Sequence, residues 1–117
     1  MQIKTFRSFH EEHKKLYEDI LKSEKKVVEL RLFDEKRKQI KIGDEILFSD
    51  SSNTNDSFTA RVINLHRAES FDKLCQIITP AQAGFTSKEE LITVLEEFYT
   101  PASQQKYGVL GIEIKKI

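Results

Sequence analysis

The chain has 117 residues, and its 19 basic and 19 acidic side chains give a formal net charge of zero. Zero net charge excludes a polycation that coats nucleic acid or membranes through bulk charge, so any anion would have to be bound by a local patch. The length suits one hydrophobic core, and we expect a single domain over residues 1–117.

The cysteine content and the hydrophobic runs favour a cytoplasmic protein without a membrane partner. No run reaches the ~20 apolar residues of a membrane span, and the N-terminal residues lack the apolar run of a signal peptide. The lone cysteine, Cys75, cannot form an internal disulfide, and its apolar surroundings predict a buried thiol.

The first elements predicted are a short strand over residues 1–6 and an amphipathic helix from about Ser8 to Lys22. His10 and His13 have the i,i+3 spacing of a ligand pair, but they lie among exposed charges. No other metal motif, phosphate-binding glycine loop or nucleophile elbow occurs, so we expect no metal and no cofactor.

Residues 25–48, KKVVELRLFDEKRKQIKIGDEILF, predict two strands joined by a charged turn. The first strand has the period-2 alternation of a half-buried strand. Glu29 and Arg31 would point outward together, and the opposite face would enter the core with Val28, Leu30 and Leu32. The turn at 34–39 should be exposed because charge is costly to desolvate, and Gly43 and Asp44 should form a tight corner.

The segment 58–68 predicts a strand whose apolar residues change face near Ile63, which means either that both faces are covered or that a bulge shifts the register. A helix over 71–78 is predicted with Ser70 as its cap. A second helix is predicted to begin at Ser87, with Glu90 at capping-box spacing, and to end at Pro101. A polar turn or half-helix and a closing strand, 109–117, follow. This order favours an α+β domain with a small curved sheet or partly closed barrel.

Charge is unevenly distributed along the chain. Between Lys22 and Lys41 eight basic residues stand against four acidic ones. Such an excess is compatible with binding a phosphate backbone, or it is a solvated turn with no partner. Aromatic residues that could stack on bases are available, although most should belong to the core: Phe33, Phe48, Phe85 and Tyr107.

Lys26, Glu29 and Arg31 are the sharpest candidates for a site. They would form a mutually satisfied cluster that binds a polar ligand, or a surface salt bridge worth ~0.2–1 kcal/mol. Regular alternation puts Lys26 on the face opposite Glu29 and Arg31. The three share a cleft only if Lys26 precedes the regular strand or lies at a twist.

This stretch resembles the signature of the ASCH (activating-signal-cointegrator homology) family of the PUA-like superfamily. The matching residues are Lys26, Glu29, Arg31, Gly43 and Asp44, and YGVLGIEI (107–114) resembles the closing strand of the family. The resemblance implies a small PUA-like β-barrel of about five to six strands with two to three flanking helices. It also implies an RNA- or nucleotide-binding protein with a cleft beside the Lys-Glu-Arg strand.

Under that resemblance the binding residues are Lys26, Glu29, Arg31, Arg37, Lys38 and Tyr107. An alternative is a small hydrolase, because some family members resemble amidohydrolases of acylated nucleosides and others ribonucleases; Lys26 and Glu29 would then be catalytic. Glu29 replaces the threonine of the amidohydrolase pattern, and Ala83-Gly84 falls where its glutamate is expected. A third possibility is an interaction protein with a salt-bridged surface.

Overall fold

The structure is a computed structural model, and it describes residues 3–8, 27–50 and 57–117. Ser8, where the first helix was predicted to begin, ends a strand, and the rest of that predicted helix, its two histidines and Lys26 lie outside the described residues. No helix among the described residues is long and apolar enough to cross a membrane.

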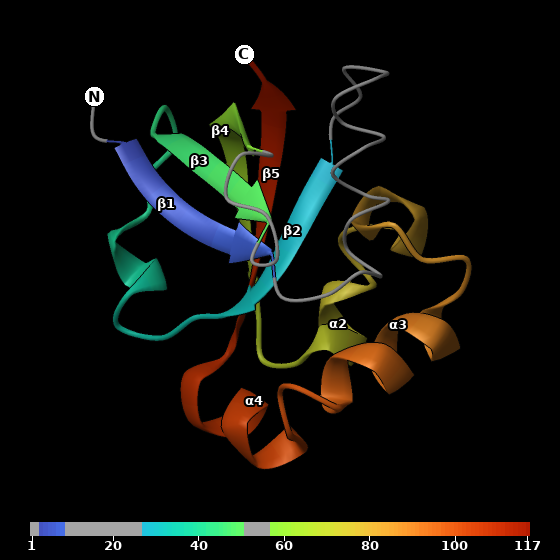
Figure 1. Cartoon of the computed structure of the whole chain (residues 1–117). Coiled ribbons are helices and arrows are strands. Elements are labelled where there is room, and N and C mark those ends of the chain that lie inside the picture. Colours follow the sequence, from blue (N-terminus) through green and yellow to red (C-terminus); the bar gives the residue numbers. More distant parts are fainter. Residues whose placement is uncertain (1–2, 9–26, 51–56) are drawn as a thin grey trace.

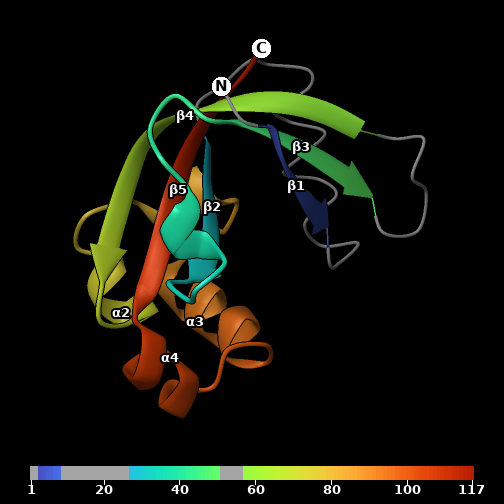
Figure 2. The ribbon, with the colours of Figure 1, turned by 90° about the vertical axis from the view of Figure 1, so that its left-hand side faces the viewer.

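The described strands form one curved sheet in the order β1-β3-β4-β5-β2 (Figure 1). Strand β1 pairs in parallel with β3, and the other three pairings are antiparallel. Figure 2 shows how β4 bends and carries β3 and β1 over one side of the sheet. The bounds are Ile3–Ser8 (β1), Val27–Leu32 (β2), Glu45–Asp50 (β3), Ser57–Ala68 (β4) and Val109–Lys116 (β5).

The predicted α+β class is confirmed, with a sheet that is curled rather than a fully formed barrel. Its antiparallel part has four strands, fewer than the expected five to six, and β1 adds a fifth by parallel pairing. The sheet therefore resembles half of a barrel, with helices packed at one side (Figure 1).

The register of β4 shifts between Val62 and Asn64. This bulge brings Val62 opposite Ile114 and Leu65 opposite Ile112, so Val62 and Leu65 contact the same core cluster despite their odd spacing. The Asn64 side chain accepts a hydrogen bond from the Leu65 backbone N–H at 2.9 Å. Of the two explanations left open by the sequence, the bulge is the observed one.

The short helices begin at polar caps. Ser70 accepts a hydrogen bond from the Lys73 N–H at the start of α2 (Phe71–Leu74), and Ser87 does the same for Glu90 at α3 (Lys88–Glu96). The predicted helix over 71–78 is thus shorter, and residues 75–78 continue as turns. Single 3₁₀ turns lie at η1 (Arg37–Gln39) and η2 (Pro80–Ala83).

Helix α4 (Pro101–Tyr107) occupies the stretch expected to be a polar turn or half-helix. Helix α3 ends at Glu96, so the prediction that it continues to Pro101 is wrong, and Pro101 instead lies in the first turn of a new helix, a position that suits proline. Thr100 caps this helix by accepting a hydrogen bond from the Ser103 N–H at 3.2 Å. Gly108 then ends it with a positive φ of 76° and leads into β5.

Apolar clusters cover both faces of the sheet. The inner cluster lies on the concave side of the sheet: Ile40, Ile46, Ala60, Val62, Leu110, Ile112 and Ile114. The outer cluster joins the sheet to the helices: Val28, Leu30, Phe71, Leu74, Ile78, Ala83, Leu91, Leu95 and Val109. Strands β2 and β5 are therefore covered on both faces.

Candidate nucleic-acid interface

Glu29 and Arg31 form a buried ion pair in β2. Arg31 Nη2 lies 3.1 Å from Glu29 Oε1, and the two residues are 2% and 1% exposed. Arg31 Nη1 also donates a hydrogen bond to the Tyr99 hydroxyl at 3.1 Å. The expectation that both side chains point outward is wrong, and so is the surface salt bridge, because both residues are buried.

The pair is buried because of its register with β5. Glu29 is opposite Ile112 and Arg31 is opposite Leu110, so both charged residues share a face with the inner cluster. Buried charges require partners because taking them out of water is costly, and here each is the other's partner. The period-2 alternation of side chains in β2 was predicted correctly, but the face that carries Glu29 and Arg31 is buried.

A chain of hydrogen bonds leads from this pair to the helices. The Tyr99 carbonyl accepts from Gln104 Nε2 at 2.9 Å, and Gln104 Oε1 accepts from the Phe71 N–H at 3.0 Å. Gln104 is only 5% exposed. Sequence reasoning missed Tyr99 and Gln104 as polar supports, since neither lies near β2 in the sequence.

The charges of the turn at 34–39 largely satisfy one another. Asp34 accepts from the Arg37 N–H at 3.0 Å and pairs with Arg37 Nη1 at 3.1 Å. Lys38 Nζ lies 3.0 Å from Glu35 Oε1. Most of this turn is exposed, as predicted. Exposed pairs of this kind are weak, so Lys38 remains available to a stronger anion.

Phe33 lies close to two cations, and we call Phe33, Lys38 and Arg67 the Phe33 cluster. Arg67 Cζ is 3.9 Å from the ring centroid and Lys38 Nζ is 5.9 Å from it, both within cation–π range. The Phe33 N–H donates to the Gly108 carbonyl at 2.9 Å, which ties the cluster to the start of β5. Arg67 was missed because it lies in β4, far along the chain.

The structure brings together some of the predicted site residues but not all. Glu29 contacts Arg31, Lys38 approaches Phe33, and Arg37 is held by Asp34. Tyr107 is 39% exposed and precedes Gly108, and its ring lies 5.1 Å from Lys106 Nζ. The Glu29 carboxylate is engaged by Arg31, and Lys26, the other residue of the hydrolase alternative, lies outside the described residues.

An open groove of about 860 Å³ lies where the end of β4 meets the helices. Its walls come from the end of β4, the turn after it, α2, α3, α4 and Gly108. Glu29 and Arg31 are not among the residues that line it, whereas Arg67 of the Phe33 cluster is. The groove and the buried ion pair are thus separate features of the molecule.

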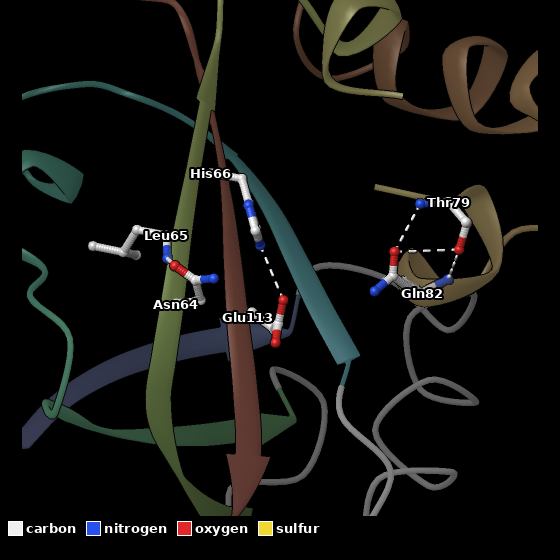
Figure 3. Close-up of polar contacts among 6 residues, drawn as sticks. All are labelled: Asn64, Leu65, His66, Thr79, Gln82 and Glu113. Atoms are coloured by element: carbon white, nitrogen blue, oxygen red, sulfur yellow. Dashed lines mark hydrogen bonds and ion pairs between the residues drawn. The ribbon is translucent and has the colours of Figure 1, made fainter. Parts of the chain in front are cut away.

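Two titratable groups lie on the other side of the sheet. Figure 3 shows His66 and Glu113 reaching toward one another from β4 and β5, with His66 Nε2 3.0 Å from Glu113 Oε1. Burial raises the pKa of the partly buried Cys75 thiol. No group of three potential metal ligands occurs in the segments that the structure describes.

A curled antiparallel sheet with helices on one side, and a buried acid–base pair in its edge strand, defines a small barrel-like α+β domain. The family model of the ASCH domain matches residues 8–117, essentially the whole chain. The chain belongs to the ASCH domain family.

Two solved structures are similar over nearly their full length. The crystal structure of hypothetical protein PH0355 has a TM-score of 0.80 and 30% identity, over 99% of this chain and 100% of that one. The solution NMR structure of PF0455 from Pyrococcus furiosus has a TM-score of 0.70 and 30% identity, over 99% and 98%. The search of curated proteins gave no match.

Proposed function

We propose that the protein binds RNA or a nucleotide beside the Lys-Glu-Arg strand. The observation that carries the proposal is the Phe33 cluster, an aromatic ring with Arg67 and Lys38 at its face. Single-stranded nucleic acids bind where bases can stack on aromatic or guanidinium planes and cations meet phosphates. Membership in the ASCH family supports the proposal, because that family is generally associated with nucleic acids.

The exposed residues carry the contacts in this proposal. Lys38 and Arg67 are exposed and would meet phosphates, with Arg37 beside them on η1. Tyr107 offers a second aromatic surface close to the Phe33–Gly108 hydrogen bond. Their charges suffice for local attraction although the whole chain is neutral.

Glu29 and Arg31 take a positioning role, since both are almost fully buried. Their ion pair fixes β2, and Phe33 follows β2 directly. Lys26, at the start of the same strand in the sequence, is proposed as a further phosphate contact. Glu29 would accept a hydrogen bond from a base or ribose only if the ligand reaches β2 itself.

The proposal is tested by titrating single-stranded RNA at low salt and measuring fluorescence anisotropy. Phe33→Leu keeps an apolar side chain but removes the stacking face, so we expect a loss of about 1–3 kcal/mol in binding free energy. Lys38→Gln should weaken binding as well. Lys115→Gln, an exposed lysine near the other end of β5, is the matched control and should bind as wild type does.

Equal affinity of the wild type and Phe33→Leu would remove the Phe33 cluster from the site. Absence of binding by the wild type at low salt would contradict the proposed function itself.

A further inference from the structure

The groove at the end of β4 has the size of a ligand site. Its volume of about 860 Å³ lies within the roughly 300–1,000 Å³ of small-molecule pockets. The lining is mixed, with both charges, amides and a few apolar groups: Arg67, Ala68, Glu69, Ser70, Asp72, Lys73, Ile92, Glu96, Pro101, Gln104, Gln105 and Gly108.

Two of its acidic residues and its lysine are already neutralised. Lys73 pairs with Glu69, and Asp72 pairs with Lys88 at the groove's edge. The Lys73 hydrogen bond lowers the pKa of Glu69, and its counterpart raises the pKa of Lys73, so both groups stay charged near neutral pH. Within the described segments this leaves two lining charges without an ion pair, those of Arg67 and Glu96.

Arg67 is suited to binding an anion. Its guanidinium lies over the Phe33 ring with Cζ 3.9 Å from the centroid, a contact that restrains the group. Stacking uses the face of a guanidinium and leaves the N–H donors in its plane for other partners. A fork of this kind matches the oxygens of a phosphate in a two-bond contact.

Glu96 supplies a hydrogen-bond acceptor in the same groove. It is half-buried at the last residue of α3 and lines the same groove. A carboxylate only accepts hydrogen bonds, and it accepts two at once from neighbouring N–H groups. Among the bases, guanine presents such a pair on its Watson–Crick edge, whereas adenine and cytosine offer one amino group there.

We infer that this groove binds a 5′-phosphorylated guanine nucleotide, with its phosphate on Arg67 and its base on Glu96. The inference rests on the proposed function, and it names a second site for the same class of ligand. The nucleotide is either free or the 5′ end of an RNA strand, since both present the same phosphate and base.

The test is a ¹⁵N NMR titration of the whole chain with guanosine 5′-monophosphate, guanosine, ribose 5-phosphate and inorganic phosphate. We expect saturable shifts of the Lys73, Gln105 and Gly108 amides with the nucleotide, and at least tenfold weaker binding of the other three. Adenosine and uridine monophosphates should also bind more weakly.

Two variants test the phosphate contact and the base contact separately. Arg67→Met keeps an aliphatic chain against Phe33 but removes the charge, and should bind the nucleotide no better than the nucleoside. Glu96→Gln should lose the preference for guanine and keep the binding of ribose 5-phosphate. Lys115→Gln is again the control, and its unchanged shifts would show that general charge is not responsible.

The inference is overturned if Arg67→Met binds the nucleotide as tightly as wild type, or if the shifts avoid the groove. If either result is found while RNA still binds in a salt-dependent way, the guanine site is refuted but the proposed function is not. Conversely, nucleotide shifts in the groove without RNA binding would remove only the proposed RNA site at the Phe33 cluster. Two oligonucleotides, one with a 5′-phosphate and one with a 5′-hydroxyl, distinguish an RNA strand end from a free nucleotide. A tenfold preference for the 5′-phosphorylated oligonucleotide identifies the strand end as the ligand. Equal affinity for the two oligonucleotides identifies the free nucleotide.

Discussion

Glu29 and Arg31 illustrate what single residues contribute to this domain. They form an ion pair on the face of the inner cluster, so replacing Arg31 removes an ion-pair partner from a buried carboxylate. We expect Arg31→Met to lower the free energy of unfolding by about 3–5 kcal/mol, measured by urea denaturation.

The double variant Glu29→Gln with Arg31→Met provides the control, because it removes both charges of the ion pair. It should be more stable than Arg31→Met alone. A loss below about 1 kcal/mol in the single variant would be the behaviour of a surface pair, and would contradict the buried environment.

Cys75 gives a prediction with a defined pH dependence. Burial raises the pKa of its thiol, while the positive charge of Lys88 opposes the shift. Because the thiolate is the reactive form, a raised pKa leaves less of it at neutral pH. We expect the rate of alkylation by iodoacetamide to rise with pH, with a midpoint above that of the urea-unfolded chain. A midpoint at or below the unfolded value would refute this.

At the scale of elements, the junction between α4 and β5 depends on Gly108. Its φ of 76° and ψ of 179° lie in a region that only glycine occupies readily, and an added Cβ would lie 3.3 Å from the Ala68 carbonyl oxygen. We expect Gly108→Ala to lower the free energy of unfolding by about 1–3 kcal/mol.

Gly43 is the matched comparison, because its φ is also positive at 96° but a Cβ added there would have no atom within 4 Å. Gly43→Ala should therefore be the less damaging substitution in the same urea denaturation. Equal losses would mean that backbone strain alone sets the cost and that the contact with Ala68 does not matter.

The elements also show where local patterns are informative. The caps Ser70 and Ser87 were predicted correctly, since a cap depends on neighbours three residues away. The bulge in β4 remained one of two alternatives, because an apolar residue on the wrong face is also explained by a second covering layer. The length of α2 was overestimated for a different reason, as apolar periodicity continues through turns that pack on the same core.

For the whole molecule, the sequence predicted the α+β class and the family, because the ASCH signature is one continuous stretch. It could not predict that both faces of β2 are covered, since alternation reports only that two faces differ. The Phe33 cluster and the groove could not be predicted from the sequence either. Phe33 and Arg67 meet only because β2, β5 and β4 are neighbours in the sheet.

In our proposal this electrically neutral chain attracts RNA through a local group of cations. The most direct measurement is the affinity for single-stranded RNA over a series of salt concentrations. With three or four phosphate contacts, the logarithm of the binding constant should fall against the logarithm of the salt concentration with a slope of about −2 to −3. Lys38→Gln removes about one contact, so the slope should become less steep by about the share of one contact. Affinity that does not change with salt would contradict RNA binding through these cations. A Lys38→Gln slope equal to that of the wild type would remove Lys38 from the site.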